Sequence, residues 1–368
     1  MRIDRIDLGA DGVIQVHGVA ENAALYTSTA SGVAALAVPD QVVTLSGPSA
    51  LYLMDTPLLR DADDGLGIYI AAGSYGSVNW HGASIFKSTD GLEFATPVTF
   101  VSAGRNAVHG RTETVLPTHG ARTWDRTNTV KVRLFRGALS SATETAVLNG
   151  ANAMLIGDEV IQFANAILNQ DGSYTLSVLL RGRRGTEWAT GGHAAGERAI
   201  ALTDAALLRT TLADAELNAL RFYKAVTVGG TLAEGTRKSL TFLGRSFMPY
   251  APVHVTGSVS GSPADWIIAW VRRSRLGGAW KDGADIPLGE ESEAYEVDVL
   301  NGGAVVRTIT ATPSAGGSVA IPSNRQATYS AADQIADFGG EQAILTVRIY
   351  QISTSVGRGF PAQAVLAA

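Results

Sequence analysis

The chain of 368 residues has no cysteine, little charge and no long apolar run. The absence of cysteine excludes disulfide bonds and thiolate metal sites. No segment reaches the roughly 18 consecutive apolar residues of a transmembrane helix. The first eight residues mix charged and apolar side chains and lack the apolar core of a secretory signal. We therefore expect a protein without a membrane span that is synthesised in the cytoplasm.

The small amount of charge is slightly negative. Charged residues make up 17% of the chain, with 29 Lys and Arg against 34 Asp and Glu, and the formal net charge is -5. Because binding to phosphate groups requires a basic surface, this balance argues against a nucleic-acid-binding protein.

Recognisable catalytic and metal-binding motifs are also missing. The sequence has no G-x-S-x-G, H-E-x-x-H or Walker motif, and its six histidines show no ligand-like spacing. The acidic run 61–64 departs from the EF-hand pattern, since Gly65 stands where a third alternate ligand belongs. The three glutamates within 290–293 are typical of a solvated face. We predict no catalytic residue, no cofactor, no metal and no enzymatic activity.

Short apolar runs separated by glycine dominate what is present. Hydrophobic residues make up 46% of the chain, which also contains 41 glycines. The apolar runs 154–156 and 160–163 flank Gly157-Asp158, the signal of a two-residue hairpin. Residues 174–180 alternate and are rich in β-branched and aromatic side chains, as a strand would be. These patterns predict a mainly β, multi-domain fold of antiparallel modules.

The length allows two or three domains, each with its own core. We expect an N-terminal β domain at 1–120, a central β-meander domain at 121–205, a return segment with a short helix at 206–248, and a β-sandwich at 249–368. The proline-containing run 246–252 marks the last boundary. The return segment is a candidate to complete the sheet begun before residue 120. About seven strands in the last segment indicate a sandwich.

Two loops contain most of the candidate receptor or glycan contacts. Residues 181–188 form a basic, glycine-punctuated loop, and its simplest interpretation is a solvated connection whose arginines cap carbonyls or pair with Asp158 and Glu159. Trp80 lies in a Gly/Ser-rich loop, where a tryptophan more often covers the edge of a core than faces a ligand. The candidate contacts are Trp80, His81, Arg183, Arg184, Trp188 and Trp280.

Residues 84–94 have the pattern of an Asp-box hairpin. We expect Ser88 and Asp90 to bond the amides of the turn, Gly91 to take a positive φ and Phe94 to pack beneath the hairpin. The pattern occurs once in the chain, which argues against a propeller.

Several stretches carry a family resemblance. LIGDEVIQF (155–163), SVLLRGRRGTEW (177–188) and LMDTPLLRDADDGLGIYIAAG (53–73) are similar to the C-terminal portion of the tail-tip hub proteins of siphophages and gene transfer agents, which are megatron-like, host-specificity proteins. The later runs 270–300 and 347–364 resemble the end of the same family. The last module resembles a fibronectin type III domain, with Trp270 in the place of the core tryptophan. The resemblance covers most of residues 50–368.

This resemblance implies a structural component of a tail tip, a hub or baseplate or the base of a central fibre, acting in tail assembly and attachment to the host surface. Its implied partners are other tail-tip proteins, further copies of itself in a homotrimer, and a host glycan or receptor. Its implied location is the virion. Two alternatives stay open: an independent carbohydrate-binding adhesion module that stacks sugars on Trp80, Trp188 or Trp280, and a cryptic glycan hydrolase suggested by the Asp-box.

Overall fold

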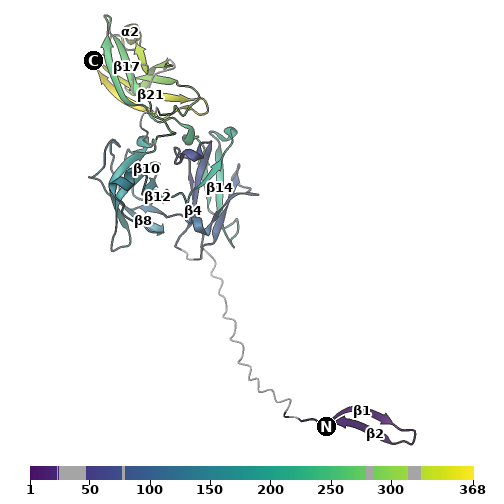
Figure 1. Cartoon of the computed structure of the whole chain (residues 1–368). Helices are drawn as coiled ribbons and strands as arrows, with labels where there is room; N and C mark the ends of the chain where they lie inside the picture. Colours follow the sequence, from purple (N-terminus) through teal and green to yellow (C-terminus); the bar gives the residue numbers. More distant parts are fainter. Residues whose placement is uncertain (23, 25–46, 77–78, 279–285, 314–324) are drawn as a thin grey trace. The chain divides into compact units, whose positions relative to one another are not determined.

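The structure is a computed structural model that describes residues 1–22, 24, 47–76, 79–278, 286–313 and 325–368 (Figure 1). The chain divides into two compact units, Met1–Thr44 and Leu45–Ala368. The fold is mainly β with antiparallel sheets, as the sequence predicts. No helix within the described residues is long and apolar enough to cross a bilayer.

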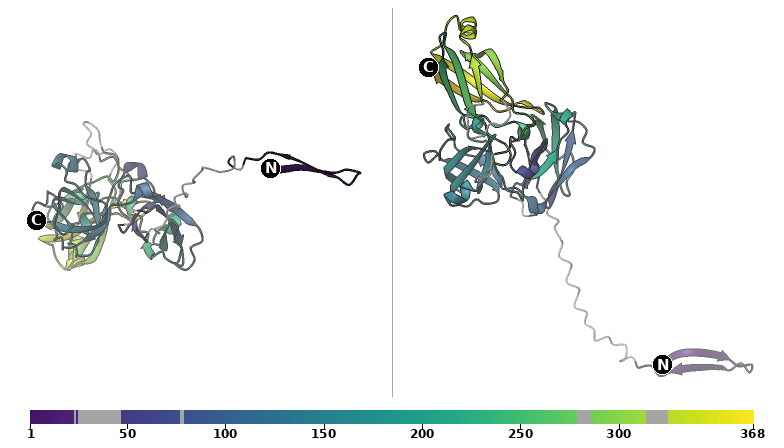
Figure 2. Two further views of the ribbon diagram at one scale, coloured as in Figure 1. Left: turned by 90° about the horizontal axis from the view of Figure 1, so that it is seen from below. Right: turned by 45° about the horizontal axis from the view of Figure 1, so that its top comes forward.

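The described part of the first unit is a hairpin of two strands, β1 (Arg2–Leu8) and β2 (Ile14–Val19). Leu8 lies opposite Ile14 and Ile6 opposite Val16 in the antiparallel register. Figure 2 shows the same two strands from two further directions.

The second unit opens with two facing sheets. One contains β3 (Ser49–Met54), β4 (Gly67–Ser74) and β13 (Leu208–Thr211). The other contains β5 (Gly82–Ser88), β6 (Pro97–Ser102), β14 (Leu220–Thr227) and β15 (Arg237–Thr241). Their inward side chains, among them Ile70, Ile85 and Tyr223, form one buried core. Strands from the return segment thus pair with strands that precede residue 120.

The return segment differs from expectation in its helical content. The short helix expected within 206–248 is absent: the segment holds strands β13, β14 and β15 and only short 3-10 turns, among them η5 (Asp214–Glu216). The leucines there do not form one stripe. Instead, Leu212 faces the core while Leu208 and Leu217 pack against it from the side.

The segment between β6 and β13 forms a closed six-stranded barrel in the order β10-β11-β8-β7-β12-β9. The strands are β7 (His109–Thr112), β8 (Val130–Arg136), β9 (Ala153–Ile156), β10 (Glu159–Leu168), β11 (Tyr174–Arg183) and β12 (Arg198–Ala201), with helix α1 (Glu144–Leu148) between β8 and β9. Ile156 pairs with Glu159, so Gly157-Asp158 is the two-residue turn predicted from the sequence. Because the sheet closes on itself, this module has no free strand edge.

The last module is a sandwich of two antiparallel sheets. The smaller sheet holds β16 (Val253–Ser260), β17 (Asp265–Val271) and β20 (Gln326–Tyr329), and the larger holds β18 (Tyr295–Asn301), β19 (Ala304–Ala311), β21 (Ile344–Ser353), β22 (Gly357–Arg358) and β23 (Ala362–Ala367), with helix α2 (Ala331–Phe338) between β20 and β21. Trp266 and Trp270 project from β17 into the shared core. Three strands facing a sheet of four main strands is the arrangement of a fibronectin type III-like domain, in agreement with the sequence prediction.

The hairpin of β18 and β19 turns on two consecutive glycines. Asn301 pairs with Ala304, so the turn residues are Gly302 and Gly303, with φ of 59° and 92°. A two-residue turn with both φ values positive suits glycine, because other residues are strained there. The remaining short elements are the 3-10 turns η2 (Asp61–Asp63), η3 (Ala103–Arg105), η4 (Glu187–Ala189) and η6 (Arg245–Phe247).

Candidate functional site

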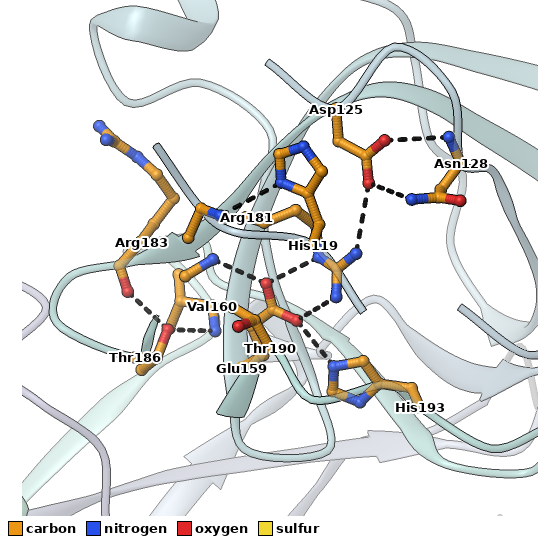
Figure 3. A network of polar contacts seen from close by, with 12 residues as sticks. His119, Asp125, Asn128, Glu159, Val160, Arg181, Arg183, Thr186, Thr190 and His193 are labelled. Carbon is orange, nitrogen blue, oxygen red and sulfur yellow. Dashed lines mark hydrogen bonds and ion pairs between the residues drawn. The ribbon is translucent and has the colours of Figure 1, made fainter. Parts of the chain in front are cut away.

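The most strongly polar place in the barrel is a buried ionic cluster, which we call the Arg181 cluster (Figure 3). It consists of Asp125, Glu159, Arg181, His193 and Glu197. The side chains of Glu159, on β10, and Arg181, on β11, are wholly inaccessible to solvent. Two loops, one before β8 and one before β12, contribute the others. The cluster therefore joins segments that are far apart in the sequence.

Glu159 lies at the centre of the cluster, and both of its oxygens are fully used. Oε1 accepts hydrogen bonds from Arg181 Nε at 2.8 Å and from the Gly182 amide at 2.7 Å. Oε2 accepts from Arg181 Nη2 at 2.8 Å and lies 2.7 Å from His193 Nε2. A carboxylate has about four acceptor positions. None is left on Glu159 for a substrate or an attacking water.

His193 is held between two carboxylates. Its Nε2 faces Glu159, and its Nδ1 lies 2.8 Å from Glu197 Oε2. Both ring nitrogens can donate at once only in the protonated imidazolium. Burial lowers the pKa of His193, but the hydrogen bonds to Glu159 and Glu197 outweigh this, and the pKa is raised. Burial likewise raises the pKa of Glu159, yet His193 and Arg181 bring it below its ordinary value.

The cluster anchors two loops to the β10–β11 hairpin. Arg181 Nη1 donates to the carbonyl of Pro117 at 2.9 Å and lies 3.4 Å from Asp125 Oδ2. Asp125 in turn accepts hydrogen bonds from the backbone and side chain of Asn128, both at 2.9 Å. These contacts fix loops that have little regular structure of their own. The arrangement is a set of ion pairs whose hydrogen-bonding positions are occupied by protein groups, and its role is to hold the two loops in place.

The sequence-based interpretation of Arg181 was right about its pairing and wrong about its surroundings. Arg181 does pair with Glu159, but it is buried, whereas we expected a solvated loop. Asp158 pairs instead with Arg198 at 2.8 Å and Arg245 at 3.0 Å. The available signal was a glutamate inside an apolar hairpin, since a charged residue in such a place needs a buried partner.

Sequence reasoning missed Asp125, His193 and Glu197 as members of the cluster. No local pattern marks Asp125 or His193, because their partners Arg181 and Glu159 are 56 and 34 positions away. Glu197 is only four positions from its partner His193, but the two residues lie in a loop whose shape the sequence does not reveal.

Trp80 and His81, two of the candidate contact residues, have different environments. Trp80 is only 4% exposed and belongs to the core of the first two sheets. Its Nε1 donates to Ser49 Oγ at 2.7 Å. His81 is exposed. The indole of Trp80 covers a core, and its faces are not available for stacking on a ligand.

Arg183 and Arg184 follow the buried Arg181 at the end of β11. Arg183 is partly buried, and its Nε donates to Gln162 Oε1 at 2.7 Å. Its carbonyl accepts from Thr186 Oγ1, also at 2.7 Å. Arg184 is exposed and has a positive φ of 56°. Of the two, Arg184 presents its side chain to solvent.

Trp188 is partly covered by neighbouring side chains. It is 39% exposed and stacks on Phe360, with ring centroids 5.8 Å apart and planes inclined by 9°. The guanidinium carbon of Arg245 lies 4.6 Å from the ring centroid. The adjacent Glu187 pairs with Arg273 at 2.8 Å. The final candidate, Trp280, lies outside the described residues.

Several of the acidic positions considered for metals or for a solvated face are paired with basic groups. Asp63 pairs with Arg60 and Asp64 with Arg275, both at 2.6 Å. The prediction of a solvated face at 290–293 was wrong for Glu290, which is nearly buried and pairs with Arg275 at 3.0 Å. Across the described ranges, no group of three or more acidic or histidine side chains is arranged to hold a metal ion.

The Asp-box turn has the predicted geometry. Ser88 Oγ donates to Asp90 Oδ1 at 2.7 Å, and the Leu92 amide donates to the same oxygen at 2.9 Å. Gly91 has a φ of 76°, and Phe94 is buried. The Leu92 and Ser88 hydrogen bonds lower the pKa of Asp90 to about 2.

The fold and the cluster together define a mainly β, multi-domain protein with a closed barrel and a fibronectin type III-like end. Residues 107–200 match the family model described as Rcc01698-like, C-terminal. This span begins just before β7 and ends within β12, so the part of the chain similar to that family is the barrel with its Arg181 cluster.

No curated protein sequence matches the chain. Among solved structures, the crystal structure of chicken CNTN1 FN1-FN3 domains matches with 11% sequence identity and a TM-score of 0.21. The match covers 71% of this chain and 66% of that chain.

Proposed function

We propose that this chain is a structural component of a phage or gene-transfer-agent tail tip, in the hub, the baseplate or the base of a central fibre. In this role it acts in tail assembly and in attachment to the host surface. The observation that carries the proposal is the family match over residues 107–200. It falls on the same barrel whose segments 155–163 and 177–188 resemble tail-tip hub proteins.

The chemistry of the barrel supports a structural role. The Arg181 cluster positions loops, and the acceptor positions of Glu159 are occupied by protein donors. We therefore propose that the chain itself is not an enzyme. Its partners would be other tail-tip proteins and further copies of itself as a homotrimer, with a host glycan or receptor bound at the surface of the virion.

The environments of two tryptophans give no support to an independent carbohydrate-binding module. Trp80 is in a core, and Trp188 is packed against Phe360 and Arg245. A sugar-stacking platform needs an open aromatic face. The tail-tip proposal is therefore the better supported of the two.

The test is the mass of the full chain in solution, measured by light scattering alone and after mixing with purified neighbouring tail proteins. A trimer, or a stable complex with a tail protein, is expected. An unrelated β-sandwich protein of similar mass, mixed in the same way, controls for nonspecific association. A strict monomer that ignores the tail proteins would overturn the proposal, and binding in a glycan array would then favour the adhesion module.

A further inference from the structure

Three arginines meet where the end of β11 approaches the start of the sandwich. Arg183 is the last residue of β11, Arg184 begins the loop that follows, and Arg273 comes two residues after β17. All three belong to the unit Leu45–Ala368. Figure 3 shows the side chain of Arg183 directed away from the buried Arg181 cluster.

The ring of Tyr250 joins the two segments. The guanidinium carbon of Arg273 lies 5.1 Å from the centroid of this ring. Gly185 packs so closely on the same ring that an added Cβ would lie 2.4 Å from ring carbon Cδ1. The backbone next to Arg184 is therefore held beside Arg273. We call Arg183, Arg184, Arg273 and Tyr250 the Arg184 patch.

The Arg184 patch carries more positive charge than its carboxylates balance. Glu187 pairs with Arg273 at 2.8 Å. Arg183 uses its Nε on the neutral side chain of Gln162, and Arg184 is exposed. Within the described residues, neither Arg183 nor Arg184 makes an ion pair with a carboxylate. This local excess of positive charge contrasts with the net charge of -5 of the whole chain.

The charges of the patch act on one another. Burial lowers the pKa of Arg183 most, and the positive charges of Arg184 and Arg273 lower it further. Burial raises the pKa of Tyr250, and the same two charges oppose this rise. Tyr250 is only 7% exposed, and its hydroxyl makes no hydrogen bond to any residue that the structure describes. An anion placed here would relieve the repulsion between the guanidinium groups and accept a hydrogen bond from the hydroxyl.

We propose that the Arg184 patch binds an acidic glycan, a sugar polymer that carries carboxylate groups. A guanidinium presents its N–H donors in a fork that matches the two oxygens of a carboxylate. A sugar ring also places neutral hydroxyl groups beside its carboxylate, which suits the hydroxyl of Tyr250. Recognition by ion pairs and hydrogen bonds needs no open aromatic face, so the packing of Trp188 against Phe360 does not oppose it.

The inference rests on the proposed function, and it narrows the expected host glycan or receptor to one chemical class. A pair of exposed or half-buried arginines binds a single carboxylate weakly in water. A homotrimer would carry three copies of the patch, and an acidic glycan repeats its charged unit. Linked contacts of this kind raise the effective concentration of the second contact to about the mM range.

The test is titration calorimetry of the full chain with an oligogalacturonate, whose sugars each carry a carboxylate. A neutral dextran oligomer of the same length controls for binding to sugar hydroxyls alone. We expect binding of the oligogalacturonate that weakens with added salt, and no binding of the dextran. Arg184→Gln should weaken binding at least ~10-fold, because it removes a charge-assisted hydrogen-bond donor.

Arg136→Gln is the matched control variant. Arg136 is also exposed and lies at the end of a barrel strand, β8. Val130 of β8 pairs with Leu176 of β11 in an antiparallel register, so Arg136 and Arg184 lie at opposite ends of these strands. Both variants remove one positive charge. We expect R136Q to bind as the unmodified chain does.

Three results would overturn the inference. The first is oligogalacturonate binding no tighter than dextran binding, and the second is an equal loss of affinity in R184Q and R136Q. The third is poly-glutamate binding as tightly as oligogalacturonate, which would show a surface that responds to charge alone. Circular dichroism of R184Q checks that the fold is unchanged, as expected for an exposed side chain.

Light scattering of the same samples with tail proteins separates this inference from the proposed function. Association with tail proteins without binding of oligogalacturonate rejects the glycan site alone. Binding of oligogalacturonate by a chain that stays monomeric and ignores the tail proteins supports the site and counts against the tail-tip role.

Discussion

Removing the Arg181 side chain should destabilise the barrel more than removing one partner of an exposed ion pair does. Arg181→Met keeps a long side chain but leaves Glu159 buried with only the Gly182 amide and His193 as donors. Breaking a buried ion pair by removing one partner costs about 3–5 kcal/mol. We expect the free energy of unfolding of the barrel to fall by about this amount.

The assay must report on the barrel, because a multi-domain chain does not unfold as one two-state unit. Hydrogen exchange of the β10 amides, from Val160 to Phe163, gives the free energy of opening locally. Arg126→Met is the matched control. Arg126 also contacts its partner Glu144 through two hydrogen bonds of 2.8 Å, but both side chains are about half exposed. We expect no measurable change in β10 exchange for this variant.

Equal effects of Arg181→Met and Arg126→Met would refute the reasoning, because only the Arg181 pair is buried and tied to further groups, among them Asp125 and His193. A double variant sharpens the test. Adding Glu159→Gln to Arg181→Met removes the unpaired buried charge. The double variant should therefore lose less stability than the sum of the two single losses. Additive losses would show that the two side chains act independently.

Three further predictions concern other parts of the second unit. Because the pKa of His193 is raised in the folded protein, the contribution of this residue to stability is complete below the ordinary value of 6.5 and is lost as the pH rises through the folded-state pKa. His193→Gln should remove this part of the pH dependence of unfolding. An unchanged pH profile would contradict the prediction. Trp80→Ala should lower the stability of the first two sheets by about 3–5 kcal/mol in denaturant unfolding, while His81→Ala, at the exposed neighbouring residue, should leave it unchanged. Asp90→Ala should speed hydrogen exchange at the Leu92 amide, and unaltered exchange there would show that the turn does not depend on this carboxylate.

Local signals in the sequence predicted the elements that depend on neighbouring residues. Gly157-Asp158 forms the turn between β9 and β10, since Ile156 pairs with Glu159. The Asp-box turn forms the hydrogen bonds that its residue types predict. Trp270 is buried in the sandwich core. In each case the deciding interactions are within a few residues or follow from alternation along a strand.

What could not be predicted depends on contacts between distant segments. Arg181 is buried because Asp125 and Pro117 approach it from a loop 56 or more positions earlier. Glu290 is nearly buried because Arg275 lies beside it, although its sequence neighbours are typical of a solvated face. Charged residues are buried only where a partner is present, and a partner so far away leaves no local pattern.

The closed barrel also limits how an assembly of this chain can be held together. A barrel has no free edge strand, so it cannot extend its sheet into a neighbour by backbone pairing. Contacts made by the barrel must come from loops and side chains, and the loops beside the Arg181 cluster are fixed in place before any partner arrives. It follows that substitutions in the Arg181 cluster should lower the stability of the barrel and release the loops that the cluster holds in place.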